Sequence, residues 1–276
     1  MKTLLIAGYG DIARRAAPRL EARYAVQPLS RRHGFDLDRP ETLSGLQGAD
    51  AVLHCTPPPN TGTQDTRTRH LLTALAKGRI LPARVVYVST SGVYGDCGGA
   101  RVDESRALRP QTDRARRRVD AERQLALWCS ERGVVLVILR VPGIYAADRL
   151  PLEQLRAGTP VLRTEDDVYT NHIHAEDLAA IAVRALENGA PAGTYNASDD
   201  SEIRMGDWFD LVAERAGLPR PPRIARTEAA GRIAPELLSF MSESRRLANR
   251  RMKEALGVRL HYPTVFEGVP QPMGAA

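Results

Sequence analysis

Apolar runs alternate with helix-like stretches through the first half of the chain. Short runs rich in β-branched residues predict buried strands at residues 4–7, 25–29, 51–55, 84–89 and 134–139. Longer stretches between them predict helices at residues 11–22, 66–77 and 114–132. Strands and helices that alternate in this way form a parallel sheet with helices on both faces. We therefore predict an α/β fold with a doubly wound parallel sheet.

A glycine turn joins the first predicted strand to the first predicted helix. Gly8 allows a tight turn, Gly10 lets a pyrophosphate come close to the backbone, and Ala13 lets the helix lie near the sheet. The helix N-terminus, which begins at Asp11 and Ile12, offers free N–H groups to phosphates. This G-x-G-x-x-A spacing favours a Rossmann-type dinucleotide-binding site. The alternative is a turn that only connects the strand to the helix.

The pattern changes after residue 145, where the pieces become shorter and Pro and Gly more frequent. We expect residues 1–145 to form the dinucleotide-binding core and residues 146–276 to be mixed. Within the second region, residues 171–199, with a helix at 177–187, return to the core. Residues 146–170 and 200–276 are expected to form a small C-terminal substrate lobe.

The residues after the second predicted strand bear on the choice of cofactor. Enzymes that select NAD usually place an acidic residue about twenty residues beyond the glycine turn, where it binds the ribose 2′-OH. Here Ser30, Arg31 and Arg32 occupy that region. A hydroxyl and two guanidiniums suit a 2′-phosphate, so NADP is predicted, with NAD as the second possibility. The other interpretation is a solvated basic turn.

Two further pairs complete the predicted cofactor site. Asp36 and Leu37 are placed at the adenine, where the carboxylate can accept from the amino group. Thr56 and Pro57 follow the strand at 51–55, and ligands of such sheets bind beyond the carboxyl ends of the strands.

The charge and the cysteine content indicate which partners and which compartment the protein is suited to. The formal net charge is +6, and only Lys2, Lys77 and Lys253 of the 39 cationic residues are lysines. An arginine-rich surface suits anionic partners such as nucleotide phosphates, but genomic codon bias is the favoured explanation of the arginine excess. No interleaved basic and aromatic pattern indicates nucleic acid. Three widely spaced cysteines predict free thiols in a cytoplasmic protein. No membrane-spanning segment or metal site is predicted.

A run of motifs in the second half of the sheet region resembles a known family. Residues 89–96 read STSGVYGD and are followed by VDE at 102–104 and AE at 121–122. Further matches are RVPGIY at 140–145, HIHAED at 172–177 and YNASD at 195–199. In order and spacing these resemble the extended short-chain dehydrogenases/reductases, the group of nucleotide-sugar epimerases and dehydratases. The resemblance spans nearly the whole chain and implies a Rossmann core with a substrate lobe.

The chain departs from that family at its Tyr-x-x-x-Lys pair. The two positions hold Arg114 and Arg118, and no tyrosine has a lysine four residues later. By resemblance, Thr90 is the hydroxyl partner of the missing tyrosine, and Arg118 keeps the contact to the nicotinamide ribose. A guanidinium stays protonated, so Arg114 cannot take the proton-transfer role of a phenol. Both this change and the short glycine motif resemble atypical members of the family.

Other residues must then supply the chemistry. Tyr94 and Tyr145 are the candidate proton donors, since the matching family segments border the nicotinamide. The alternative is that both tyrosines are core residues that only pack against their neighbours. The candidate substrate contacts are Ser91, Arg114, Arg149 and His174. His172 shares a face with His174 in an extended segment, and histidine suits acid–base work. A hydrogen-bonded core histidine is the alternative for His174, and Asp177 is expected to be the N-cap of the helix after it.

We predict an NADP-dependent oxidoreductase or epimerase-like enzyme for a small hydroxy or carbonyl substrate that is anionic or sugar-derived. The alternative is a non-catalytic NAD(P)-binding sensor or scaffold. An open polar cleft would favour the enzyme, and a cleft plugged by arginines and apolar side chains would favour the alternative. The helix at 114–132 often forms the dimer interface in the resembling family, which makes a homodimer the expected assembly.

Overall fold

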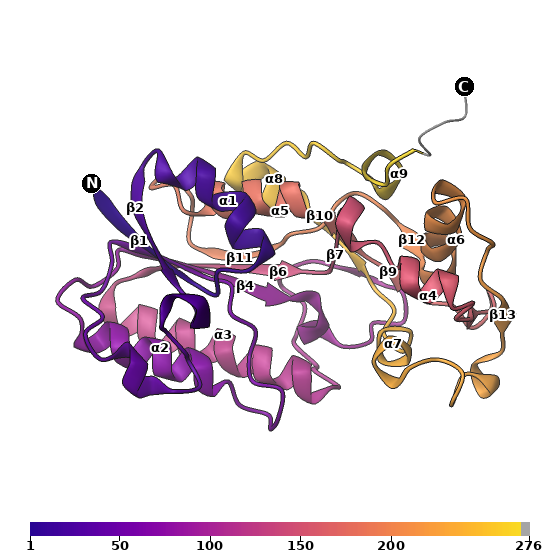
Figure 1. Cartoon of the computed structure of the whole chain (residues 1–276), viewed down its shortest axis with the longest axis horizontal. Helices are drawn as coiled ribbons and strands as arrows, with labels where there is room; N and C mark the ends of the chain where they lie inside the picture. Colours follow the sequence, from indigo (N-terminus) through magenta and orange to yellow (C-terminus); the bar gives the residue numbers. More distant parts are fainter. Residues whose placement is uncertain (272–276) are drawn as a thin grey trace.

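A computed structural model describes residues 1–271 of the chain. Its centre is a six-stranded sheet in the order β11-β6-β4-β3-β1-β2, and every neighbouring pair is parallel. The predicted α/β class and doubly wound parallel sheet are confirmed (Figure 1). The strands span β1 Lys2–Ala7, β2 Tyr24–Leu29, β3 Ala51–His54, β4 Arg84–Thr90, β6 Val135–Val141 and β11 Gly193–Asn196.

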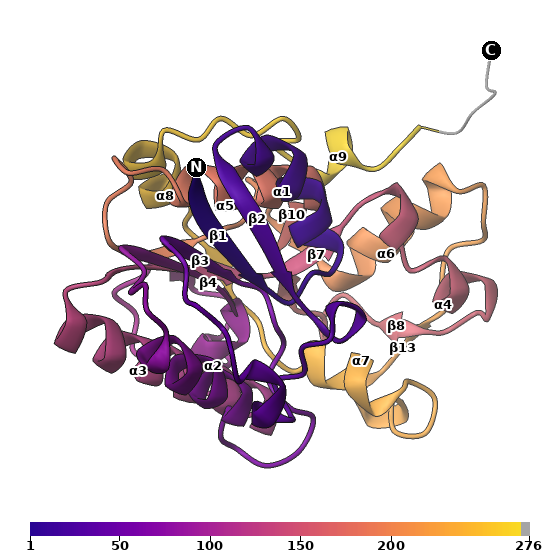
Figure 2. The same cartoon turned by 60° about the vertical axis from the view of Figure 1, so that its left-hand side comes forward.

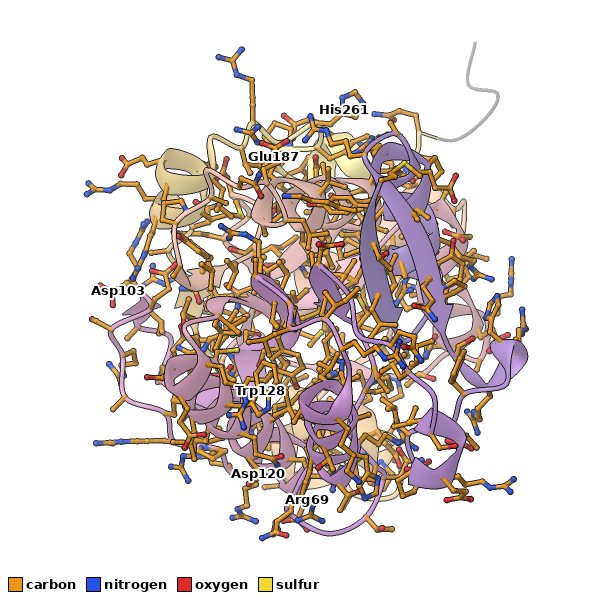
Figure 3. The ribbon with its side chains drawn as sticks, turned by 90° about the vertical axis from the view of Figure 1, so that its left-hand side faces the viewer. Arg69, Asp103, Asp120, Trp128, Glu187 and His261 are labelled. Carbon is orange, nitrogen blue, oxygen red and sulfur yellow. The ribbon has the colours of Figure 1, made fainter. Side chains whose placement is uncertain are left out.

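Helices cover both faces of this sheet because successive strand residues point to opposite sides. Leu4 and Ile6 of β1 pack in one cluster with α1 (Asp11–Glu21) and α5 (Ala175–Ala185). Leu5 and Ala7 pack in a second cluster with α2 (Thr66–Lys77) and α3 (Asp113–Arg132). Figure 3 shows the two layers, with Arg69 and Asp120 on one side of the sheet and Glu187 on the other.

Shorter elements extend from this core. The short strands are β5 Arg101–Val102, β7 Gly143–Tyr145, β8 Val161–Leu162, β9 Tyr169–Thr170, β10 His172–His174, β12 Ile203–Arg204, β13 Arg223–Ile224 and β14 Arg246–Leu247. The remaining α-helices are α4 Leu152–Arg156, α6 Met205–Arg215, α7 Pro235–Phe240, α8 Arg250–Leu256 and α9 Val265–Gly268. Single 3-10 turns lie at Arg31–His33, Pro40–Leu43, Ser91–Tyr94, Ala147–Arg149 and Arg226–Glu228. Between residues 1 and 271, none of the helices has the length and hydrophobicity that a membrane crossing needs.

A small lobe lies beyond the carboxyl ends of the sheet strands. Figures 1 and 2 show α4, α6 and α7 gathered there, away from the helices that cover the sheet. The lobe has its own core, in which Trp208 and Phe209 of α6 pack with Leu155 and Met241. It therefore forms one wall of a cleft whose other wall is the sheet domain.

The last part of the chain corrects the expected extent of this lobe. Residues 246–260 do not belong to it, because β14 pairs with β5 of the sheet domain. Met252 and Leu256 of α8 pack in the cluster that also holds α1 and α5. The short, Pro- and Gly-rich composition after residue 200 gave no sign that the chain returns to the sheet.

The start of α5 differs from the prediction in a way that matters for the site. His174, not Asp177, is the N-cap, since its Nδ1 accepts from the Glu176 N–H at 3.2 Å. The Asp177 carboxylate instead accepts the backbone N–H groups of His261 and Tyr262, at 2.7 and 2.9 Å. An imidazole nitrogen can cap a helix as a hydroxyl oxygen does. Because His174 caps α5, the Asp177 carboxylate is available to bind the C-terminal segment.

Candidate functional site

Two adjoining cavities lie at the carboxyl ends of the sheet strands. The first, of about 740 Å³, is lined by the glycine turn, and we call it the turn cavity. The second, of about 540 Å³, lies between α3 and the lobe, and we call it the lobe cavity. Six residues line both: Pro57, Thr90, Arg118, Pro142, Ile144 and Arg149. The two cavities are therefore parts of one cleft.

The glycine turn has the geometry that a close-lying phosphate requires. Gly8 has a φ of +85°, and a Cβ added there would lie 2.6 Å from the backbone nitrogen of Thr56. A Cβ added to Gly10 would meet no protein atom within 4 Å, although this residue lines the turn cavity. Gly8 is thus required by the fold, whereas Gly10 leaves free space at the N-terminus of α1. A pyrophosphate fits that space and the N–H groups beside it.

The structure brings every predicted cofactor residue to the turn cavity. They are Gly8, Gly10, Asp11, Ile12, Ser30, Arg31, Arg32, Asp36, Leu37, Thr56, Pro57 and Arg118. Arg31 and Arg32 are exposed and form no ion pair with any residue of the described chain, 1–271. The Thr56 hydroxyl oxygen is buried and has no hydrogen-bond partner within that range. Free guanidiniums and an unsatisfied hydroxyl are consistent with a bound phosphate-bearing ligand.

Arg67 belongs to this cavity but was not predicted. It pairs with Asp38 at 2.6 Å and donates to the carbonyl oxygens of Pro57 and Pro58, at 2.9 and 3.2 Å. It therefore fixes the proline loop against the segment that carries Asp38. Nothing in the sequence near Arg67 distinguishes it from Arg69, the other arginine of α2.

Thr90 stands where the two cavities meet. It ends β4, and its Oγ1 accepts from the Gly92 N–H at 3.2 Å. A hydroxyl that accepts one hydrogen bond still has its own proton to donate, here to a ligand in the cleft. Ser91, the next residue, is buried and lines the lobe cavity.

The arginines at the family's Tyr and Lys positions both face the cleft. Arg118 lines both cavities, and its Nη1 donates to the Val88 carbonyl and the Tyr87 hydroxyl, at 3.0 and 3.1 Å. Arg114 lines the lobe cavity, with its guanidinium carbon 4.2 Å from the centre of the Phe240 ring. Arg149 lines both cavities and pairs with Asp11 at 2.9 Å.

The position of Tyr94 does not support its predicted role as a proton donor. It is 1% exposed and lines neither cavity. Its hydroxyl donates to Asn196 Oδ1 at 2.8 Å and accepts from Arg140 Nη1 at 3.0 Å. Arg140 in turn pairs with Glu122 of α3 at 2.8 Å in a fully buried contact. Tyr94 is therefore part of the polar network that fixes α3 to the sheet.

Tyr145 does line the lobe cavity, but its hydroxyl is already engaged. It donates to the Thr264 carbonyl at 3.3 Å, and it packs against Gly268. Burial raises the pKa of Tyr145, so the phenol keeps its proton at neutral pH.

Of the two histidines of β10, His172 lines the cleft, whereas His174, the predicted substrate contact, does not. His174 does not line either cavity, because its imidazole caps α5 and packs against Tyr262. His172 lines the lobe cavity instead, 4.3 Å from the Trp208 ring. Its Nδ1 is buried and unpartnered within residues 1–271, and burial lowers the pKa of His172 to about 3. Residues two apart on a strand point to the same side, so the difference comes from the end of β10, where the His174 imidazole caps α5.

The family follows from comparison with known proteins. The model of the NAD dependent epimerase/dehydratase family matches residues 12–198. The chain belongs to this family. The predicted resemblance to extended short-chain dehydrogenases/reductases is confirmed, and with it the assignment to NAD(P)-dependent enzymes of the oxidoreductase and epimerase type.

Three similar proteins show how far this likeness extends. The 3-diazoavenalumate denitrifying reductase of a Streptomyces species is 30% identical over 128 residues, which span 45% of this chain and 37% of the reductase. A functionally unknown conserved protein from Silicibacter pomeroyi has a TM-score of 0.76 and 30% identity, over 97% of this chain and 96% of that one. RMD from Pseudomonas aeruginosa, solved with NADPH, has a TM-score of 0.75 and 19% identity, over 97% and 96%. At 19% identity the likeness shows the fold alone.

Proposed function

We propose that this chain is an NADP(H)-dependent oxidoreductase or epimerase-like enzyme that acts on a small, anionic hydroxy or carbonyl compound. The observation that carries the proposal is the continuity of the two cavities at Thr90, Arg118 and Arg149. A nicotinamide dinucleotide, when bound, supplies hydride exchange at a carbon of the substrate. A cleft that continues from the turn cavity into a second open cavity favours an enzyme over a sensor or scaffold. The Streptomyces relative is named a reductase, which supports the reductive direction.

The residues of the turn cavity would hold the cofactor in a definite order. Gly10 and the N-terminus of α1 would receive the pyrophosphate, and Arg31 and Arg32 the 2′-phosphate. Arg118 is held by a backbone carbonyl and a tyrosine, so its remaining N–H groups can bind the ribose near the shared wall. The neighbour from Pseudomonas aeruginosa was solved with NADPH, so a fold of this kind can accommodate that cofactor.

The residues at the shared wall would orient the substrate and its proton. Thr90 would donate a hydrogen bond from its hydroxyl to the substrate oxygen, because its Oγ1 accepts from the Gly92 N–H and leaves its own hydrogen available. Of the two tyrosines predicted as proton donors, only Tyr145 lines the cleft. To donate a proton to the substrate it must first break its hydrogen bond to the Thr264 carbonyl. His172 is neutral because of its lowered pKa, so it can form a hydrogen bond to the substrate without adding charge.

The cofactor assignment is tested by titrating the protein with NADPH and with NADH while following nicotinamide fluorescence. We expect NADPH to bind at least tenfold tighter, and the preference to disappear in Arg31→Ala/Arg32→Ala. Arg39→Ala, an exposed arginine nearby that lines neither cavity, is the matched control. An equal affinity for both nucleotides would contradict the 2′-phosphate argument, and failure to bind either would contradict the proposed function.

The proposed assembly is a homodimer through α3. This rests on the outward face of the helix, where Leu127 is 63% exposed. Light scattering in solution tests it, with Leu127→Glu expected to shift a dimer to monomer.

A further inference from the structure

The lobe cavity has two walls of opposite character. The first two turns of α3 contribute Arg114, Arg117 and Arg118, which we call the cationic wall. The lobe contributes Met205, Trp208, Phe209, Leu237 and Phe240, which we call the apolar wall. A ligand that fills this cavity must satisfy both walls at once.

The charge of the cationic wall is not neutralised by the protein. Among residues 1–271, none of its three arginines forms an ion pair. The one carboxylate that lines the cavity, Glu243, is paired with Arg245 at 2.8 Å. Arg114 is exposed, Arg118 half-buried and Arg117 buried, and guanidiniums without a carboxylate partner suit an anion in the cavity.

Arg117 is the most buried of the three arginines of the cationic wall. It is only 7% exposed, and its Nη1 donates to the Gly62 carbonyl at 2.6 Å. Its Nε is buried and has no partner within the described chain. The protein therefore offers this guanidinium a neutral carbonyl and no counter-ion within residues 1–271, and its positive charge is left to act on the cavity.

The apolar wall favours a ligand that has an apolar part. Trp208 and Phe209 are at least 95% buried, and Trp208 is packed on the rings of His172 and Tyr145, at 4.3 and 5.5 Å. Sugar hydroxyls placed against this wall would lose water without gaining partners. A flat apolar body would instead bury its surface there, and could continue the stack that the Arg114 guanidinium makes on Phe240.

We propose that the substrate is an amphipathic organic acid, with a planar apolar body against the apolar wall and a carboxylate at the cationic wall. The cavity volume of about 540 Å³ is within the range of sites for compact organic ligands. This inference rests on the proposed function only in taking the lobe cavity as the substrate site. It replaces a sugar-derived substrate by an aryl acid.

Calorimetric titration of the whole protein, with and without NADPH, tests the proposal with defined probes. We expect 2-naphthoate to bind at least tenfold tighter than acetate, 2-naphthalenemethanol or UDP-glucose. Naphthyl phosphate distinguishes the anion, and tighter binding of that compound than of the carboxylate would overturn the choice of carboxylate. Equal or tighter binding of UDP-glucose, or no binding of any naphthyl compound, would overturn the proposal as a whole.

Variants assign the effect to each wall. Arg114→Met keeps the bulk of the side chain and should weaken naphthoate at least fivefold while leaving the neutral alcohol unchanged. Phe240→Ala should weaken both compounds. Arg116→Met, on the exposed side of the same helix and paired with Asp113, is the matched control and should change neither. An unchanged naphthoate affinity in Arg114→Met would contradict the cationic wall.

The readouts separate this inference from the proposed function. Naphthoate binding without NADPH binding, as followed by nicotinamide fluorescence, would contradict the proposed function and support the amphipathic site. NADPH binding together with a preference for UDP-glucose would do the reverse.

Discussion

The turn cavity and the lobe cavity are built in different ways. The turn cavity is made mainly of short segments that follow sheet strands, joined by Arg67 of α2, Arg118 of α3 and Arg149, so most of the site coincides with motifs along the chain. The lobe cavity is assembled from segments between Pro57 and Arg245, and its two walls come from different cores. The turn cavity therefore depends on local backbone geometry, whereas the lobe cavity depends on how the two parts of the molecule are fixed together.

The largest expected effect comes from breaking the contact that fixes α3, and with it the cationic wall. Glu122 accepts from Arg140 at 2.8 Å and from the Ser89 hydroxyl at 2.6 Å, and both charged side chains are buried. Glu122→Ala leaves the Arg140 charge buried without its partner, and we expect the free energy of unfolding to fall by about 3–5 kcal/mol. Urea denaturation measures this loss.

Glu131→Ala is the matched control for this prediction. Glu131 lies on the same helix and pairs with Arg132 at 2.9 Å, but it is exposed, so its removal should cost less than about 1 kcal/mol. Similar losses for the two variants would show that α3 is not fixed by the buried pair.

The second prediction concerns the backbone of the turn cavity. Gly8→Ala meets both a positive φ and the Thr56 backbone at 2.6 Å, and we expect it to destabilise the fold by at least about 2 kcal/mol. Gly34→Ala has nearly the same φ, +82°, but no neighbour within 4 Å. It should therefore cost only the conformational part, about 1–2 kcal/mol. Thermal or urea unfolding of the pair measures the contribution of the close approach, and equal losses would mean that Thr56 moves aside.

The same contrast explains what could be predicted from the sequence. The strands, the glycine turn and the residues around Arg31 were found because each signal lies within a few adjacent residues. The return of α8 to the sheet was missed because it depends on contacts between distant segments. For the same reason the sequence named His172 and His174 together and did not show which of them lines the cleft. Arg117 could have been found, since it lies three residues after Arg114 and thus on the same side of a helix. Tyr94 was misjudged because its partners, Asn196 and Arg140, are brought to it only by the sheet.

The third prediction tests the lobe cavity through pH. Burial lowers the pKa of His172 to about 3 from 6.5, so the unfolded chain binds a proton that the folded chain does not. Above pH 6.5 both states are unprotonated at this residue and the folded state keeps its full stability. As the pH falls from 6.5 toward 3, protonation of His172 stabilises only the unfolded chain, and the free energy of unfolding falls. Between pH 7 and pH 5 the parent protein should lose about 2 kcal/mol more than His172→Gln does.

Denaturation at the two pH values measures this difference. His54, whose pKa burial also lowers to about 3, and Asp199, whose pKa burial raises to about 7, remain in both proteins and cancel. The exposed His33→Gln is the control and should follow the parent. If His172→Gln follows the parent as well, His172 is not held neutral in the cavity wall.

The smallest effect on the fold is expected at Gly10, and it separates binding from stability in the turn cavity. Gly10 has an ordinary φ of −87°, and an added Cβ would meet no protein atom. Gly10→Ala should therefore change the free energy of unfolding by less than about 0.5 kcal/mol. The same methyl group would occupy the space assigned to the pyrophosphate, so NADPH affinity should fall at least tenfold, which corresponds to about 1.4 kcal/mol. Fluorescence titration beside urea denaturation gives both quantities. A variant that unfolds like the parent and also binds NADPH like the parent would show that the pyrophosphate does not lie against Gly10, and the glycine turn would then serve only to join β1 to α1.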